Sequence, residues 1–434
     1  MIEFYFKGVC MYLIKSRSIT DLHARQILDS RGIPTVSVDV VLSDSSVGTA
    51  EVPSGASTGK YEACELRDNA NEYNGKSVYH TIDTILNDIK PIILERSIND
   101  LYQLDTLLCH LDGTMNKSRL GANAILAISL AYTKAQATSY GQPLFRYLGG
   151  IHGHLMPVPM MNIINGGAHA NNNLDIQEFM IMPHGAKSFS EAIRMGCETY
   201  QALKQLHKER SFPTAVGDEG GFAPNLSSHE EALMMIVDAI EKAGYIAGQD
   251  ISIALDIAAS EWKKDGMYHM PKQNRKYSAQ ELSQYYETLC TSYPIYSIED
   301  PFGEEDFESF TRFTQKHSEL QIVGDDLFVT NPKRIKRGIE LASANAVLIK
   351  PNQIGTLSET LQAIELAQEG SFNTVISHRS GDTPDTSIAD IAVAVNAGQI
   401  KTGAPCRGER IAKYNRLLEI EEMLGSFAQF ATFR

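Results

Sequence analysis

The chain has 434 residues, of which 43 % are hydrophobic and 21 % are charged, an ordinary composition for a globular protein with a sizeable core. Its formal net charge of −14 argues against a nucleic-acid-binding protein, although a local cluster of cations can still bind a small anion. The six cysteines are scattered without a CxxC pair, so we expect a cytoplasmic location. No apolar run approaches the length of a membrane span.

Residues 1–19 form a separate N-terminal extension in our interpretation. A short apolar patch between Lys7 and Lys15 is at the lower limit for the centre of a signal peptide, and no small-residue cleavage site follows it. Met11 is an alternative start. We therefore expect a disordered or loosely packed extension rather than a signal peptide.

Residues 20–150 predict an α+β domain, because strands come first and a run of helices follows. The alternating segment 35–42 indicates a strand. The segment 54–63 is rich in Gly, Ser and Thr, and it is either a plain connector, which is the simpler interpretation, or a lid that closes over a ligand. Glycines and prolines at 148–159 mark a domain boundary. The helical patterns lie at 78–95, with an interruption at Pro91, at 101–111 and at 120–140.

Residues 151–434 open with two apolar runs at 158–164 and 174–182. The segment between these runs is too short for a helical crossover, so the two strands must pair antiparallel if they are neighbours. Helices are expected next, two of which begin with the signature of a capping box. These helices lie at 187–208, at 230–244 after Ser228 and Glu231, and at 281–290 after Ser278 and Glu281.

Six further apolar strands each end in a polar residue, and successive ends are 23 to 43 residues apart. This spacing holds a strand, a helix and two loops, so the order is β-β-α-α-(βα)₆ and predicts a TIM-like barrel. The carboxyl ends of parallel barrel strands meet on one face, where the active site lies. The polar residues at the six ends are Asp256, Glu299, Asp325, Lys350, the run from His378 through Arg379 to Ser380, and Lys401.

Asp256, Glu299 and Asp325 end three consecutive strands, which favours a metal site over three unrelated helix caps or salt-bridge partners. Carboxylate oxygens suit a hard cation such as Mg²⁺. Lys350 and Lys401 could be surface lysines with buried stems, but both end apolar strands at the same rim, which favours a function.

Three other polar segments are less specific. His378, Arg379 and Ser380 form either a polar loop or, beside a metal, a site for phosphate or carboxylate, for which Arg supplies a planar fork. Glu219, between Asp218 and two glycines, would alone be a turn residue. His169 would alone be a loop histidine.

The chain resembles the enolase family through DSRGIPT, VPSGAST, QEFM, GDEGGFAP, SIEDPF, GDDL, KPNQIGT, SHRSGDT and GQIKTGA, which stand in the family's order from about residue 20 to the end. The resemblance implies an N-terminal α+β domain that caps a β-β-α-α-(βα)₆ barrel. It implies the reversible dehydration of 2-phospho-D-glycerate to phosphoenolpyruvate, a lyase reaction of glycolysis and gluconeogenesis, with two Mg²⁺ per active site. It also implies a homodimer or an octamer.

The motif positions carry the family's residue roles onto this chain. The resemblance implies that Lys350 is the base at C2 and that Glu219 is the acid at the C3 hydroxyl, with Glu178 assisting. We expect Lys401 and the metals to lower the pKa of Lys350, and the pKa of Glu219 to be raised so that it holds a proton near neutral pH. The implied ligands of the first Mg²⁺ are Asp256, Glu299 and Asp325, with Ser57 joining the second, and the implied substrate-binding residues are His169, Gln177, His378, Arg379, Ser380 and Lys401.

The departures from the family pattern do not touch a proposed ligand or base. Asn171 stands where the family often has Asp, and Asp382 and Pro384 replace a more usual Glu-rich loop. One alternative is an acid-sugar dehydratase or racemase of the same superfamily, which would lack Glu219 and the SHRSG motif. Another is a secondary role as a surface receptor or scaffold, with a secreted or cell-surface fraction. The C-terminal residue, Arg434, weakens the receptor version because that role is often tied to a C-terminal lysine.

Overall fold

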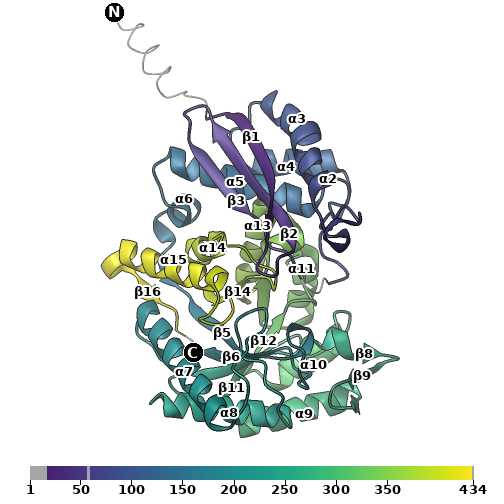
Figure 1. Cartoon of the computed structure of the whole chain (residues 1–434), viewed down its shortest axis with the longest axis vertical. Helices are drawn as coiled ribbons and strands as arrows, with labels where there is room; N and C mark the ends of the chain where they lie inside the picture. The colour runs from purple at the N-terminus through teal and green to yellow at the C-terminus, as the bar shows by residue number, and fades with distance from the viewer. Residues whose placement is uncertain (1–16, 56–58, 433–434) are drawn as a thin grey trace, which may run out of the picture.

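The computed structural model describes residues 17–55 and 59–432. Figure 1 shows an elongated molecule, with a small sheet and its helices at one end and a barrel at the other. Residues 1–16 of the expected extension lie outside the described residues, and so does Ser57. Within the described part, no helix is both long and apolar enough to pass through a membrane.

The N-terminal part contains an antiparallel meander that packs on a buried helix. Val36, Val38 and Val40 alternate along β2 and are fully buried, as the alternation of 35–42 predicts, and α5 packs against β2 and β3. The strands are ordered β1–β2–β3 in the sheet. Their bounds are Ile19–Leu28 for β1, Pro34–Leu42 for β2 and Val47–Glu51 for β3.

The helix that was expected to be interrupted at Pro91 continues through this residue. A π-helical turn, η2, comes directly before, and Lys90 N–H donates to the carbonyl oxygen of Ile85. Pro91 follows this turn as the second residue of α3. The wider hydrogen-bond spacing of a π turn accommodates a residue that cannot donate. The elements of this region are η1 (Glu72–Gly75), α2 (Tyr79–Asp83), η2 (Thr84–Ile89), α3 (Lys90–Leu94), α4 (Leu101–Asp112), α5 (Ala122–Ser139), α6 (Leu144–Gly149) and η3 (Gly150–His152).

The C-terminal part is a closed barrel of eight strands within the described residues, in the order β11-β12-β13-β14-β15-β5-β6-β7. β6 runs antiparallel to both of its neighbours, and the other neighbouring strands are parallel. This arrangement confirms the predicted β-β-α-α-(βα)₆ barrel. The strands are β5 (Val158–Asn165), β6 (Glu178–Met182), β7 (Ser252–Asp256), β11 (Ile295–Glu299), β12 (Gln321–Gly324), β13 (Ala346–Ile349), β14 (Asn373–Ser377) and β15 (Gly398–Lys401).

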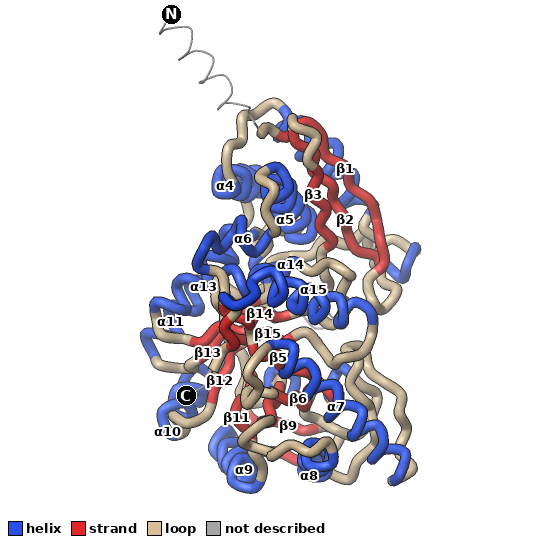
Figure 2. Tube along the Cα trace, turned by 90° about the vertical axis from the view of Figure 1, so that its left-hand side faces the viewer, coloured by secondary structure: helices blue, strands red, loops and turns tan. Residues whose placement is uncertain are grey.

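Helices surround the barrel, and short elements decorate its loops. Figure 2 shows α14 and α15 between the N-terminal sheet and the barrel strands. The helices are α7 (Phe189–Glu209), α8 (His229–Lys242), α9 (Ala279–Ser292), α10 (Phe307–Lys316), α11 (Pro332–Leu341), α12 (Pro351–Ile354), α13 (Leu357–Glu369), α14 (Ser387–Ala394) and α15 (Gly408–Leu424). The short elements are β4 (Leu155–Met156), η4 (Gly167–His169), η5 (Ala259–Trp262), β8 (Lys263–Lys264), β9 (Met267–Met270), β10 (Arg275–Tyr277), η6 (Gly425–Phe427) and β16 (Gln429–Phe430).

The two predicted capping boxes differ in the structure. Ser278 and Glu281 form the complete reciprocal box at the start of α9. At α8, the Ser228 hydroxyl accepts the N–H of Glu231 as expected, but the Glu231 carboxylate accepts from Ser227 instead. The second box is therefore only half formed.

The second barrel strand is shorter than the expected run 174–182. The N–H groups of Asp175 and Ile176 donate to Nε2 of His229, a side chain of α8, rather than to a neighbouring strand. β6 therefore begins only at Glu178.

Hydrogen bonds join the two parts next to the open end of the barrel. Ser54 and Gly381 form an isolated bridge between the N-terminal part and the loop after β14. Ser358 N–H, in the first turn of α13, donates to the Asp105 carboxylate of α4 at 2.9 Å. The isolated bridge holds Ser54 beside the loop that contains His378.

Candidate active site

The polar strand ends meet at one rim of the barrel, as the sequence predicts. Asp256 at the end of β7 is in register with Glu299 at the end of β11. Asp256 is also in register with Glu178, the first residue of the antiparallel strand β6. A strand that runs backwards contributes its beginning, rather than its end, to this rim.

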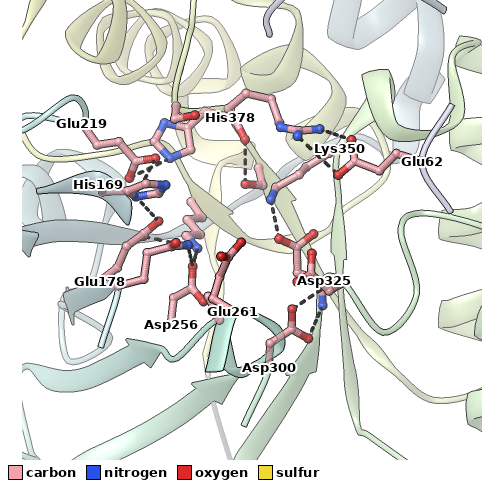
Figure 3. A pocket seen from close by; sticks show the side chains of 17 residues that line it. Glu62, His169, Glu178, Glu219, Asp256, Glu261, Asp300, Asp325, Lys350 and His378 are labelled. Carbon is pink, nitrogen blue, oxygen red and sulfur yellow. Dashed lines mark hydrogen bonds and ion pairs between the residues drawn. The ribbon is translucent and has the colours of Figure 1, made fainter. Parts of the chain in front are cut away.

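A pocket at the rim contains most of the predicted residues (Figure 3). Glu299 does not line the pocket. Its side chain is fully buried and accepts a hydrogen bond from Lys401, which does line the pocket. Ser57 lies outside the described residues. The predicted residues that line the pocket are His169, Gln177, Glu178, Glu219, Asp256, Asp325, Lys350, His378, Arg379, Ser380 and Lys401.

Lys401 is the cation around which three carboxylates gather. Its Nζ lies 3.0 Å from Asp256 Oδ2 and 3.0 Å from each carboxylate oxygen of Glu299. Glu178 Oε2 is 3.3 Å away. Burial acts to lower the pKa of Lys401, but these carboxylates outweigh it and hold the pKa well above its ordinary value. Lys401 is therefore a fixed positive charge at the floor of the site.

Lys350 pairs with Asp325 on the other side of the pocket. Its Nζ donates to Asp325 Oδ2, while Gln353 Nε2 donates to Asp325 Oδ1 at 2.8 Å. Burial acts to lower the pKa of Lys350, but Asp325 outweighs burial, and the pKa is raised. The expected lowering of the Lys350 pKa rested on Lys401 and the metals together. Against Arg379 and Lys401 alone, the anionic partner Asp325 dominates and the pKa is raised.

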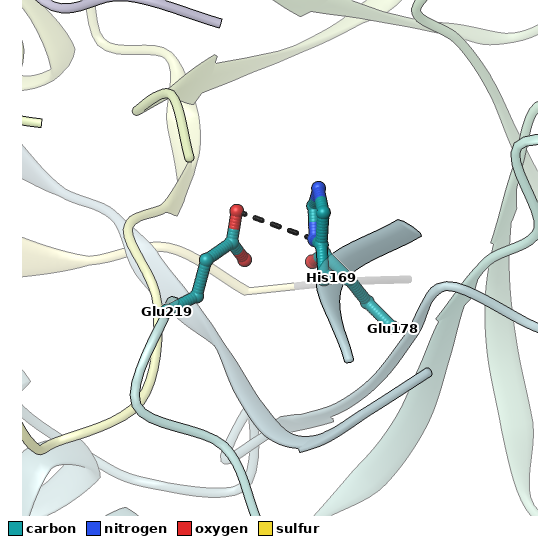
Figure 4. A group of neighbouring side chains, drawn as sticks. All are labelled: His169, Glu178 and Glu219. Carbon is teal, nitrogen blue, oxygen red and sulfur yellow. Dashed lines mark ion pairs between the residues drawn. The ribbon is translucent and has the colours of Figure 1, made fainter. Parts of the chain in front are cut away.

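Glu219, His169 and Glu178 form a second group, shown in Figure 4. His169 Nδ1 lies 3.4 Å from Glu178 Oε1 and 3.5 Å from Glu219 Oε1. Asn162 Nδ2 donates to Glu219 Oε2 at 3.0 Å. The histidine thus lies between two carboxylates that come from different elements, β6 and the loop between α7 and α8.

The carboxyl groups of Glu178 and Glu219 have different proton affinities. Burial and the nearby Glu219 raise the pKa of Glu178 to about 7. Burial also acts to raise the pKa of Glu219, but His378 and His169 outweigh it and hold this pKa well below its ordinary value. The expected upward shift is therefore found at Glu178, and the expectation for Glu219 is wrong.

Arg379 is held by Glu62, a residue outside the predicted site. Glu62, from the segment after β3, accepts from Arg379 Nη1 at 2.9 Å and from Nη2 at 3.3 Å. Both side chains are buried to more than nine-tenths. The only signal for Glu62 in the sequence was its place in the predicted connector or lid at 54–63.

Family models match both parts of the chain. The model for the enolase N-terminal domain matches residues 19–148, and the model for the enolase C-terminal TIM barrel domain matches residues 153–434. The enolase of Acidothermus cellulolyticus is 56 % identical over 414 residues, which cover 95 % of this chain and 96 % of that protein. This chain belongs to the enolase family.

Enolase family membership implies a divalent metal, and the carboxylates at the rim fit one. Asp256, Glu299 and Asp325 offer only oxygen atoms, which a hard cation prefers. Carboxylate oxygens of Asp300, Asp325 and Asp326 lie within 4.8 Å of one another, as do ligand atoms of His169, Glu178 and Glu219. Lys401 and Lys350 are the groups that neutralise the predicted metal ligands in this structure.

Asp300 and Asp326 are two further acids of this enolase site that the sequence analysis passed over. Asp300 Oδ1 accepts the N–H of Asp325 at 3.0 Å, and Oδ2 accepts the N–H of Asp326 at 2.7 Å. Asp300 therefore fixes the backbone from which Asp325 projects. The motifs SIEDPF and GDDL contain both acids, but only contact between neighbouring strands reveals their relation.

Proposed function

We propose that this chain catalyses the reversible, Mg²⁺-dependent dehydration of 2-phospho-D-glycerate to phosphoenolpyruvate, as a hydro-lyase of glycolysis and gluconeogenesis. The observation that carries the proposal is the pairing of a candidate base with a candidate acid across one pocket. Lys350 lies on one side, and the group of Glu178, His169 and Glu219 lies on the other (Figure 3). Removal of a proton and of a hydroxyl group from adjacent carbons needs both.

In this proposal Lys350 takes the proton from C2. Its amine must be neutral to do so, and its bond to Asp325 opposes the neutral form. When a bound cation neutralises Asp325, the carboxylate no longer raises the pKa of Lys350, and the amine can become an effective base. Gln353 donates to Oδ1 of Asp325, the oxygen that Lys350 does not contact. This bond keeps the carboxylate in place when a cation binds it.

Glu219 gives a proton to the departing C3 hydroxyl, and Glu178 assists. A carboxyl group whose pKa is about 7 holds a proton for part of the time at neutral pH, so Glu178 is the reservoir in the resting enzyme. His169 lies within 3.5 Å of both carboxylates and can relay the proton from Glu178 to Glu219. The two glutamates thus act together as one acid: Glu178 stores the proton, and Glu219 delivers it to the C3 hydroxyl.

The substrate's carboxylate and phosphate are bound by cations and short donors that line the pocket. Lys401 is a permanent positive charge, and Arg379 offers a planar fork that suits an anion with two oxygens. Burial in the pocket excludes water from the charge that develops on the substrate. The remaining substrate-binding residues in this proposal are His169, Gln177, His378 and Ser380.

Asp256, Glu299 and Asp325 would hold the first of two Mg²⁺, and Ser57 would contribute to the second. When bound, Mg²⁺ would stabilise the negative charge that accumulates on the substrate carboxylate after C2 is deprotonated. We also propose that residues 20–150 and 151–434 are the two domains, after an extension at 1–19. The cellular enzyme would be a cytoplasmic homodimer or octamer; the cysteines of the described part are free, which supports a reducing compartment.

The decisive experiment follows the absorbance of the enol product after 2-phosphoglycerate is added, with and without a chelator. We expect product only when Mg²⁺ is available, and readdition of Mg²⁺ should restore turnover. Turnover of an acid sugar with none of 2-phosphoglycerate would replace the proposal with the dehydratase or racemase alternative. Turnover that the chelator leaves unchanged would contradict the metal assignment.

A further inference from the structure

Arg410 is a completely buried arginine that belongs to none of the motifs singled out in the sequence. It projects from the first turn of α15 and has no exposed surface. A buried guanidinium is costly unless hydrogen bonds and counter-charges satisfy it. The groups that satisfy Arg410 therefore indicate what its burial achieves.

The guanidinium connects the two loops that carry His378 and Glu219. Arg410 Nη1 donates to the carbonyl oxygen of Arg379 at 2.6 Å, and Nη2 donates to that of Ser380 at 2.6 Å. Nη2 also donates to the carbonyl oxygen of Asp218, next to Glu219, at 3.2 Å. One planar group thus binds the backbone of both loops.

The same guanidinium contacts the ring of His378. Arg410 Nη1 lies 2.6 Å from His378 Nδ1. An arginine side chain is always protonated and can only donate, so Nδ1 must accept. A neutral His378 must then carry its proton on Nε2. Burial lowers the pKa of His378 to about 4, which keeps the ring neutral at physiological pH.

His378 Nε2 faces the carboxylate of Glu219. It lies 3.4 Å from Glu219 Oε2 and makes no hydrogen bond to any of the described residues. An N–H at this position can donate to Glu219 or to an oxygen atom of the substrate. The opposite tautomer would instead place a lone pair against the carboxylate, which is repulsive.

The surroundings of Arg410 are built to hold it. Asp382 Oδ2 lies 3.5 Å from Nη1, and Lys413 shares the same carboxylate at 3.0 Å. Gly403 leaves room for the stem, since a Cβ there would lie 2.9 Å from Arg410 Cδ. These contacts determine both the charge balance and the path of the side chain.

We propose that Arg410 is a positioning residue, which fixes His378 with its proton on Nε2 and holds the His378–Ser380 loop against the loop that bears Glu219. The inference rests on the proposed function of Glu219 and His378. It predicts that Arg410 matters for loss of the C3 hydroxyl and much less for removal of the C2 proton, because the amine of Lys350 is held by Asp325 and not by Arg410.

The first test reads the tautomer directly. ¹⁵N NMR of the full-length protein labelled at histidine should show an unprotonated Nδ1 and a protonated Nε2 for His378, which is assigned by its absence in His378→Gln. In Arg410→Met the Nδ1-protonated form should appear. A protonated Nδ1 in the wild type, or an unchanged tautomer in Arg410→Met, would overturn the proposal.

The second test separates the two chemical steps. Arg410→Met should lower the rate of phosphoenolpyruvate formation by about 10- to 100-fold while exchange of the C2 proton with solvent falls much less. Added guanidinium ion should partly restore dehydration in Arg410→Ala. Equal losses of exchange and dehydration would overturn the proposal.

A matched control and a fallback variant complete the design. Arg416 lies on the same helix but does not line the pocket, and it pairs with Asp390 at a distance of 2.7 Å. Arg416→Met should therefore leave the ratio of the two rates unchanged. If Arg410→Met does not fold, Arg410→Gln places an amide oxygen that can accept from Nδ1, so the Nδ1-protonated form should appear there as well. A wild type that does not act on 2-phosphoglycerate would refute the proposed function, whereas the tautomer would still decide the role of Arg410.

Discussion

Lys401 Nζ lies equally close, at 3.0 Å, to both carboxylate oxygens of Glu299, and both side chains are buried. Asp256 Oδ2 lies at the same distance. The lysine thus neutralises acids that the proposed function assigns to a metal. This relationship leads to a prediction about stability that is independent of turnover.

Lys401→Met should destabilise the metal-free protein, because it leaves buried carboxylates without their counter-charge. We expect a loss of about 3–5 kcal/mol in the free energy of unfolding measured in urea. Saturating Mg²⁺ should recover part of this loss, since the cation binds the same acids. Lys316→Met, which breaks an exposed pair with Glu287, should cost about 1 kcal/mol or less. Equal losses in the two variants would contradict the prediction.

Lys350→Ala should abolish exchange of the C2 proton of 2-phosphoglycerate with D₂O, because the variant lacks the amine that accepts the proton. The rate should fall by about 10²- to 10⁴-fold. Mg²⁺ binding, measured by calorimetry, should persist, since Asp256 and Glu299 keep their positions through Lys401. Retained exchange would remove Lys350 as the base.

Glu219→Gln should separate proton removal from hydroxyl loss. The amide keeps the shape and can still contact Asn162, but it cannot deliver a proton to C3. Exchange at C2 should therefore continue while phosphoenolpyruvate formation stops, as NMR and absorbance would respectively record. If both activities fall by the same factor, the assignment of separate roles to Glu219 and Lys350 is wrong.

Asp105, which does not line the pocket at the barrel rim, should make stability depend on pH. Burial raises the pKa of its carboxyl to about 6, whereas the unfolded chain has the ordinary value of 3.8. The folded state therefore holds a proton that the unfolded state has lost, and the free energy of unfolding falls as the pH rises from about 4 to about 6. Asp105→Asn cannot ionise, so it should be more stable than the wild type at pH 7 by about 1–3 kcal/mol and similar at pH 4.

A matched control for Asp105→Asn lies on the same helix. Asp100 accepts the N–H of Gln103 at the start of α4, and asparagine caps a helix equally well. Asp100→Asn should therefore show the wild-type dependence of unfolding on pH in urea titrations. A loss of stability at pH 7 in Asp105→Asn would show that the ionised carboxylate is favourable there.

The barrel and the rim residues were predictable because strand direction fixes them. Apolar runs that end in Asp256, Glu299 and Lys350 at regular spacing leave few topologies in which their ends do not meet. The ion pairs within the rim were not predictable. Side-chain packing decides that Asp325 contacts Lys350 closely enough to outweigh the nearby cations. The proton affinity of Glu219 was misjudged for the same reason.

Residues that act across chain segments gave little local signal. Arg410 lies in a stretch without a pattern of its own, and Glu62 was marked only by its place in the segment 54–63, yet they contact His378 and Arg379 from other elements. The prediction at Pro91 was wrong for a different reason. Sequence rules treat an interior proline as a helix break, but here a π turn directly before α3 keeps the helix continuous. Local rules thus predicted the frame and missed the long-range links.

The reversed direction of β6 means that the wall bearing Glu178 is built by a hairpin instead of a helical crossover. The residues between β5 and β6, which include His169 and Gln177, are joined at both ends to adjacent strands. This short stretch can be exchanged as a cassette without re-threading any helix. In the proposed function this wall faces the leaving group, so a replaced β5–β6 loop would change that side of the pocket while Lys350 stays on the parallel frame of the barrel.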